Sequence, residues 1–318
     1  MQEQIEKVCD IIFEGGGIRG IGLVGAVSAL EQNGYKFRKL AGSSAGAIVA
    51  SLLSAGYTSK ELHEIMSKLD FEKFKQTNFW HNFGRVGKAI SATRNFGVYS
   101  AQAFEDWLAN LLAQKNVFTF ADLNGQLKIT ASDVTDSTIL VLPDDLVRFG
   151  INPDSFSVAT AVRMSMSIPI FYEPYELRDA NGKLHFIVDG GLLSNYPIWI
   201  FDDGISIPEY PILGLRFARS ARQAKTRPPR FREFLMQIIT ATLDSNDEIF
   251  HARNYGDTER TIHISTIAGD RNIRTTDFDI TNSQTNALFN NGYDAGNNFI
   301  KAWNFSNWKN KFRGLCLG

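Results

Sequence analysis

The chain has 318 residues, a formal net charge of −1 and 44% hydrophobic residues, which is typical of a globular protein with a sizeable core. The near-neutral charge argues against a global field that would recruit nucleic acid or an anionic membrane. Its two cysteines, Cys9 and Cys316, do not form a disulfide framework and favour a reducing compartment. The N-terminus lacks the features of a signal peptide and no apolar run could span a bilayer, so we expect a cytoplasmic protein; secretion without a cleaved signal stays open.

The first part of the chain alternates strand-like and helix-like segments. Strands are predicted at residues 8–13 and 36–42, and helices at 21–34, 45–56 and 58–69. The first helix stops at Asn33-Gly34, and the third opens on Thr58 and Ser59 followed by Glu61, a typical N-cap pattern. This strand–helix order predicts a parallel sheet with both faces covered.

The rest of the chain continues with a mixture of both element types. Helices are predicted at 101–115, 157–167, 231–243 and 287–304, and strands at 127–134, 138–143, 183–191, 211–217 and 261–266. Between the two parts, residues 70–98 are rich in aromatic side chains. We interpret the aromatic stretch 79–96 as a helical cap packed on the core, with a lid or a bilayer-facing rim as the alternative.

A basic segment precedes the predicted helix at 231–243. The sequence "ARSARQAKTRPPR" is predicted to be a solvated loop; a patch for anionic membranes or a site for an anionic regulator are the alternatives. The helix carries an apolar stripe at helical spacing, which predicts a core-facing side. The stripe comprises Phe231, Phe234, Leu235, Ile238 and Ile239.

The string Gly42-Ser43-Ser44-Ala45-Gly46 fits the G-x-S-x-G pattern of a nucleophile elbow. In such an elbow the glycines let the strand and the helix approach each other, and the N–H of Ala45 would point at a developing oxyanion. An ordinary glycine-flanked turn is the alternative, because the pattern alone is common.

A second glycine-rich string, "EGGGIRG", follows the first strand. Through Gly15, Gly17 and Gly20 it also fits the dinucleotide-binding pattern G-x-G-x-x-G. That hypothesis requires an acidic residue at the end of the next strand, and "KLAGSSAG" contains none. Consecutive glycines instead expose backbone N–H groups, as an oxyanion hole requires. A plain turn that tightens the strand–helix unit stays open.

A third string, "VDGG", ends the predicted strand at 183–191. It places Asp189 at the edge of the sheet where α/β folds keep their chemistry. Taken alone, an Asp-Gly pair is more commonly a turn.

In this order and spacing the three strings resemble the patatin-like phospholipases, which are related to the cytosolic phospholipases A2. The block "ATAVRMSMSIPIFYEPYEL…FIVDGGLLSNYPI" is similar to the same family, so the resemblance covers about residues 8–217. It implies a single domain over residues 1–318 with three layers, α/β/α, around a central, mostly parallel sheet. Residues 218–318 would complete that fold.

The resemblance also implies roles for particular residues. Ser44 would be the nucleophile and Asp189 the proton acceptor, while Ala45 and the loop Gly15, Gly16 and Gly17 would form the oxyanion hole. Glu14 stands where the family usually has Asp, and it lies outside the residues expected to donate to the oxyanion. Arg19 is predicted to contact a lipid phosphate or, as an equal alternative, to make structural contacts around the loop.

The function implied by the resemblance is that of a serine hydrolase cleaving fatty-acyl esters of phospholipids or related lipids, without a cofactor or metal. A small-ester carboxylesterase or acyltransferase, and a catalytically silent module that binds anionic ligands, are the alternatives. Peripheral contact with a membrane would suit the lipid hydrolase, and no nucleic acid partner is expected.

The family uses a Ser–Asp dyad, so we predict that no histidine is required for catalysis. The rival is a Ser-Asp-His triad that recruits His251 or His263, both downstream of Asp189. His185 is a weaker rival because four residues along a strand separate it from Asp189 by roughly 13 Å.

Overall fold

The computed structural model describes residues 7–69, 74, 96–218, 234, 237–238, 241–242, 256–277 and 279–314. Its centre is a mostly parallel sheet in the order β10-β9-β1-β2-β4-β8-β7, with β5 paired to β4. The strands are β1 (Val8–Phe13), β2 (Lys36–Ser43), β4 (Leu127–Asp133), β5 (Thr138–Leu142), β7 (Tyr175–Arg178), β8 (Leu184–Asp189), β9 (Ile212–Phe217) and β10 (Thr261–Ile264). The run from β10 to β4 is parallel, whereas β5 and β8 are antiparallel to β4.

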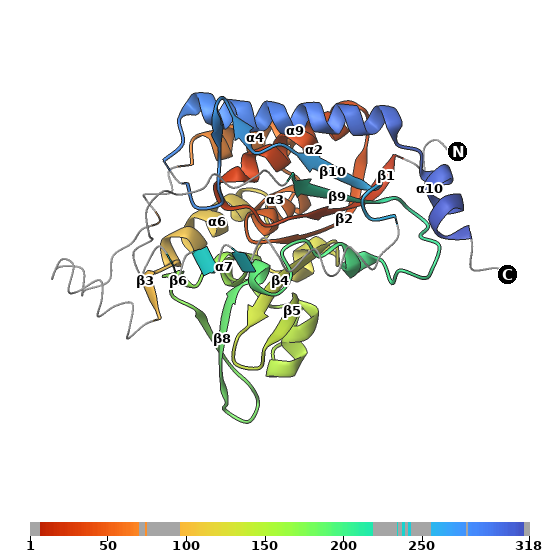
Figure 1. The fold of residues 1–318 in the computed structure, drawn as a ribbon. Coiled ribbons are helices and arrows are strands. Elements are labelled where there is room, and N and C mark those ends of the chain that lie inside the picture. The colour runs from red at the N-terminus through yellow and green to blue at the C-terminus, as the bar shows by residue number, and fades with distance from the viewer. Residues whose placement is uncertain are drawn as a thin grey trace.

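Helices flank this sheet (Figure 1). They are α2 (Gly20–Gln32), α3 (Ala45–Ser54), α4 (Ser59–Ser67), α6 (Gln102–Gln114), α7 (Val158–Met166), α9 (Asn282–Ala302) and α10 (Phe305–Phe312). Two short pairs, β3 (Gly97–Tyr99) with β6 (Ile170–Tyr172) and β11 (Ile267–Ala268) with β12 (Arg271–Asn272), lie outside the main sheet.

The two faces of the sheet are covered unequally. Ile11 and Phe13 of β1 belong to the large core that includes α2, α3, α4, α6 and α7. Ile12, between them, belongs to a smaller cluster with Tyr196 and with Ile198 of the 3₁₀ turn η7 (Ile198–Phe201). Neighbouring side chains of a strand point to opposite faces, so the larger cluster with its helices and the smaller cluster lie on opposite faces of the sheet.

Local signals in the sequence predicted several of these elements correctly. Strand β1 covers the predicted residues 8–13, and α2 ends beside Asn33, with Gly34 at a φ of 83°. Helix α4 begins with a capping box in which Thr58 and Glu61 satisfy each other's backbone N–H groups. The short helix α10 was not predicted from the sequence.

The C-terminal part of the chain packs against the first helices. Strand β10 extends the sheet beside β9, and α9 runs along α2 in Figure 1. The two helices approach closely at Gly292, where a Cβ atom would lie 1.8 Å from the carbonyl oxygen of Gly22. Beyond α10, Arg313 donates a hydrogen bond of 2.6 Å to Asp202. Residues 256–314 are thus joined to the sheet and to its helical layer.

Two sequence predictions fall largely on undescribed residues. Of the aromatic stretch 79–96 only Phe96 is described, and its side chain is 58% exposed. The basic segment after residue 218 lies outside the described residues, as does most of the predicted helix 231–243. Phe234 and Ile238, the described members of its apolar stripe, are 51% and 48% exposed, which contradicts the predicted core-facing side for these two positions. Periodicity defines a face of a helix but not what covers it.

In the part of the chain that is described, no helix combines the length and the apolar character needed to cross a membrane.

Candidate active site

Ser44 lies on a sharp turn between β2 and α3. Its φ of 52° and ψ of −123° are disfavoured for a non-glycine residue, at a cost of about 1–3 kcal/mol. The turn is possible because the flanking glycines have no side chain. A Cβ on Gly42 would lie 2.4 Å from the carbonyl carbon of Gly46, and one on Gly46 would lie 2.5 Å from the carbonyl oxygen of Phe13. The string G-x-S-x-G therefore has the strained geometry of a nucleophile elbow.

The hydroxyl of Ser44 meets a carboxylate from a distant part of the chain. Ser44 Oγ donates a hydrogen bond of 2.6 Å to Oδ2 of Asp189, which ends β8. Asp189 Oδ1 accepts the N–H of Gly191 at 2.8 Å, and the N–H of Asp189 donates to the carbonyl of Ser167 at 2.9 Å. Both Ser44 and Asp189 are buried, with 6% and 1% of their surface exposed.

The sheet topology brings these two residues together. β2 and β8 pair with successive parts of one edge of β4, where Thr130 pairs with Ser43 and the adjacent Ala131 pairs with Asp189, while β5 pairs with the other edge. The carboxyl ends of parallel strands lie at one edge of a sheet, but β8 is antiparallel to β4. That rule therefore does not explain why Asp189 lies beside Ser44. The meeting of Ser44 and Asp189 depends on the length and register of β8.

Burial makes Asp189 a stronger base than an ordinary carboxylate. Removal from water raises the pKa of Asp189 from 3.8 to about 7, and the hydrogen bonds from Ser44 and Gly191 oppose only part of this rise. A group with a pKa near neutrality can accept and return a proton efficiently at neutral pH.

The glycine loop from Glu14 to Gly20 borders the pair. The N–H of Gly15 donates to the carbonyl of Asn195 at 2.9 Å, so the structure removes Gly15 from the predicted oxyanion donors. Among the hydrogen bonds of the described residues, none takes the N–H of Gly16, Gly17 or Ala45. These three groups remain the candidate donors.

Two charged side chains of this loop hold it in place. Glu14 accepts the N–H of Phe217 at 2.5 Å, which directs its carboxylate toward β9. Arg19 donates to Thr275 Oγ1 at 2.7 Å and to the carbonyl of Gly16 at 3.2 Å, and its guanidinium lies 4.7 Å from the ring centre of Phe217. These contacts correspond to the structural alternative for Arg19, while its contact with a lipid phosphate stays a prediction.

Two buried polar residues near the site had no assigned role from the sequence. Ser165 Oγ accepts the N–H of Ser44 at 2.9 Å, and Asn195 Nδ2 donates to the carbonyl of Gly15 at 3.2 Å. Both lie inside the block that resembles the family. Beyond that resemblance, the sequence showed only that each is a polar residue among apolar neighbours. Local patterns do not say which backbone groups such residues meet.

The histidines that could complete a triad lie elsewhere or outside the described residues. His185 Nδ1 is bonded to Asp133 Oδ2 at 2.7 Å, and His263 is exposed on β10. His251 lies outside the described residues. The hydrogen-bond partners described for the Asp189 carboxylate are Ser44 and Gly191.

His185 also belongs to a group of potential metal ligands. Atoms of Asp133, Asp136 and His185 lie within 4.8 Å of one another. Asp133 Oδ1 accepts the N–H groups of Thr135 and Asp136, and Asp136 pairs with Lys183. These contacts join the β4–β5 turn to β8, so the group is explained as a structural clasp.

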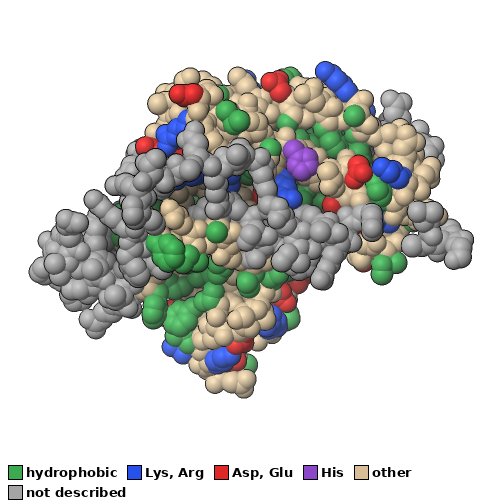
Figure 2. All heavy atoms as spheres, in the orientation of Figure 1, with side chains coloured by type: hydrophobic (Ala, Val, Ile, Leu, Met, Phe, Trp, Pro, Cys, Tyr) green, Lys and Arg blue, Asp and Glu red, His purple; other side chains and the backbone are tan. Residues whose placement is uncertain are grey.

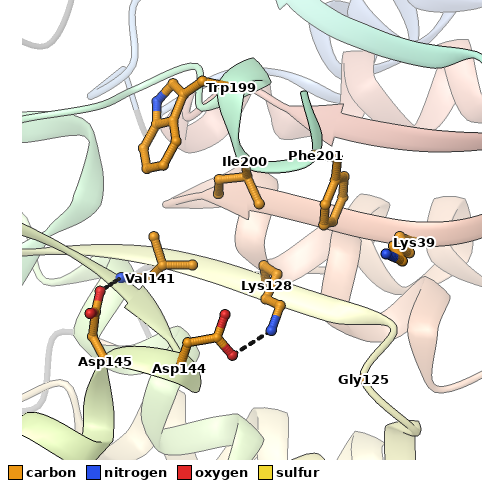
Figure 3. Close-up of a pocket in the computed structure, with 9 residues that line it drawn as sticks. All are labelled: Lys39, Gly125, Lys128, Val141, Asp144, Asp145, Trp199, Ile200 and Phe201. Carbon is orange, nitrogen blue, oxygen red and sulfur yellow. Dashed lines mark hydrogen bonds and ion pairs between the residues drawn. The ribbon is translucent and has the colours of Figure 1, made fainter. Parts of the chain in front are cut away.

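A surface hollow of about 420 Å³ lies away from Ser44. In Figure 3 Trp199, Ile200 and Phe201 of η7 lie over the strands that carry Lys39 and Lys128. Neither Ser44 nor Asp189 is among the residues that line it. The hollow is therefore separate from the Ser44–Asp189 pair.

Comparison with known proteins identifies the family of this chain. The family model described as patatin-like phospholipase matches residues 11–202, more than half of the chain. This chain belongs to the patatin-like phospholipase family.

Individual relatives support the same assignment. The chain is 37% identical over 297 residues to YqhO of Bacillus subtilis (strain 168), an uncharacterized protein, with 93% of this chain and 99% of that protein covered. It is 26% identical over 204 residues to the probable lipid hydrolase 463L of Invertebrate iridescent virus 6, covering 59% and 61% of the two chains. The crystal structure of VipD from Legionella pneumophila matches with a TM-score of 0.56 at 18% identity, covering 93% of this chain and 67% of that one, which shows a shared fold.

Proposed function

We propose that this protein hydrolyses fatty-acyl esters of phospholipids or related lipids through a Ser44–Asp189 dyad. The observation that carries the proposal is the 2.6 Å hydrogen bond from the Ser44 hydroxyl, on a strained turn, to a buried carboxylate. A silent binding module has no need of that strain, which is retained mainly where it contributes to a mechanism.

The reaction follows from the positions of these groups. Ser44 Oγ attacks the ester carbonyl carbon while Asp189 Oδ2 takes the hydroxyl proton. The N–H groups of Gly16, Gly17 and Ala45 are proposed to bind the oxyanion, aided by the N-terminus of α3. As the tetrahedral intermediate collapses, Asp189 gives the proton to the leaving alcohol. Water then attacks the acyl-enzyme and gives a proton to Asp189, which passes it to Ser44 Oγ as the fatty acid leaves, so that the hydroxyl and the carboxylate are both regenerated.

Apolar surface near the dyad supports a lipid substrate. Ile168, Ile170 and Phe171 follow Ser167, whose carbonyl holds Asp189, and form a small cluster of their own. Ile170 and Phe171 are partly exposed in and around β6, next to β3 and to Phe96. Figure 2 shows apolar side chains gathered over this region of the surface. We propose that acyl chains or a membrane surface contact this region.

Covalent labelling tests the proposal most directly. A fluorophosphonate should label the wild-type protein but not Ser44→Ala, because the reagent reacts with an activated serine hydroxyl. Ser43→Ala is a matched control: Ser43 is also buried, and its Oγ makes no hydrogen bond among the described residues. Labelling of Ser44→Ala, or loss of labelling in Ser43→Ala alone, would contradict the assigned nucleophile.

The substrate class needs a second experiment. Incubation with liposomes of mixed phospholipids, followed by lipid analysis, should show free fatty acid and lysophospholipid that are absent with Ser44→Ala. Hydrolysis of short soluble esters without any lipid product would instead favour a small-ester carboxylesterase. A protein with neither labelling nor turnover would be a silent binding module.

A further inference from the structure

The backbone of Ser44 is held by a side chain that has no part in the proposed proton transfer. Its N–H donates to Ser165 Oγ at 2.9 Å, and Ser165 is fully buried near the end of α7. The next N–H along the chain, that of Ala45, is a proposed oxyanion donor. The hydrogen bond therefore fixes the Ser43–Ser44 peptide, and only the Cα of Ser44 separates this peptide from the one that carries the Ala45 N–H.

Helix α7 is a firm support for this contact. Thr160 and Arg163 of α7 both bond to the carboxylate of Glu105 on α6, the arginine at 2.9 Å. At the end of α7 the carbonyl of Ser167 accepts the N–H of Asp189 at 2.9 Å. The same helix end thus binds the backbone of both members of the dyad.

The strain at Ser44 gives the hydrogen bond its importance. A φ of 52° persists in a non-glycine residue only where the surroundings enforce it. A buried N–H without a hydrogen-bond partner costs free energy. The acceptor oxygen of Ser165 therefore stabilises the strained backbone conformation of Ser44 relative to a relaxed conformation that would lose this hydrogen bond. We propose that Ser165 is a positioning residue that keeps Ser44 Oγ at Asp189 and the Ala45 N–H at the oxyanion; this inference rests on the proposed function.

Replacement of Ser165 tests the role through kinetics. In Ser165→Ala, kcat on a soluble acyl ester should fall about 10- to 100-fold, because small displacements of reacting groups are costly. KM should stay near the wild-type value, since Ser165 does not touch substrate. Ser165→Thr, which keeps an acceptor oxygen, should restore most of the rate. The pH midpoint of kcat should not move, because the surroundings of Asp189 are retained.

A matched control separates positioning from general damage. Ser51 is also fully buried and donates from its hydroxyl to the carbonyl of Ile48 at 2.9 Å, within α3. Ser51→Ala should keep the wild-type kcat in a folded protein. A folded Ser165→Ala with wild-type kcat would overturn the inference, and so would equal losses in both variants or a raised KM with a shifted pH midpoint.

Amide hydrogen exchange at Ser44, followed by NMR, gives a readout that needs no substrate. Exchange should be slow in the wild type and at least about tenfold faster in Ser165→Ala but not in Ser51→Ala, because only the first loses the acceptor. Equal exchange rates would overturn the inference. If the wild type hydrolyses no acyl ester, the proposed function fails, and this exchange measurement still decides whether Ser165 holds Ser44.

Discussion

The buried carboxylate of Asp189 should make the protein less stable than it would be with a neutral side chain. Burial raises the pKa of Asp189 to about 7 in the folded protein, against an ordinary value of 3.8. The folded state therefore holds the proton more tightly than the unfolded state. The contribution of this bound proton to the free energy of unfolding is fully present below about pH 4 and is lost as the pH rises towards 7.

Asp189→Asn removes this penalty and gives a magnitude to test. Three pKa units at about 1.4 kcal/mol each imply that the variant gains about 4 kcal/mol in unfolding free energy at pH 8, and about 2 kcal/mol at pH 5. The amide oxygen can still accept the Gly191 N–H, and its NH₂ group can face Ser44 Oγ, so the contacts are largely kept. Turnover should fall about 10²- to 10⁴-fold because the general base is lost.

Urea unfolding of both proteins at pH 5 and pH 8, with turnover on a soluble ester, checks this prediction. Ser44→Ala is the control: it keeps the buried carboxyl but loses the hydrogen bond that lowers the pKa of Asp189, so its stability should depend on pH at least as strongly as that of the wild type. The reasoning would be refuted if Asp189→Asn were less stable than wild type at pH 8, if its gain did not depend on pH, or if it kept substantial activity.

Three further predictions follow from the same geometry. The kcat of the wild type should rise with pH through a midpoint near 7, as Asp189 loses its proton, and a flat pH–rate profile from 5 to 8 would contradict its role as base. His185→Gln should lower the unfolding free energy by about 1–3 kcal/mol, because Asp133 loses a buried partner, while turnover per folded molecule stays unchanged. A loss of turnover equal to that of Ser44→Ala would instead favour a triad. Gly42→Ala should abolish fluorophosphonate labelling or folding, since its Cβ would lie 2.4 Å from Gly46, and normal labelling would show that the turn is less tight.

Much of this fold could be predicted because its signals are local. An apolar run stopped by glycines predicted β1, the strand-like run "KFRKLAG" before Ser44 predicted β2, and the capping box of Thr58 and Glu61 predicted the start of α4. The string G-x-S-x-G predicted the strand–turn–helix around Ser44, because only glycines at both ends allow so close an approach. Such features depend on a few neighbouring residues and need no knowledge of the rest of the chain.

The sequence by itself therefore determined the order of most strands and helices, the strings expected to carry the chemistry and the family. Only the tertiary structure decided that β8 runs antiparallel to β4 and ends with Asp189 Oδ2 2.6 Å from Ser44 Oγ. It also decided that the N–H of Gly15 donates to the carbonyl of Asn195 and that Ser165 accepts the N–H of Ser44. The three hydrogen bonds join residues more than a hundred positions apart, and the pairing of β4 with β8 joins residues more than fifty positions apart. Strand direction, register and the pairing of buried polar groups depend on how the whole chain packs, and no local pattern contains that information.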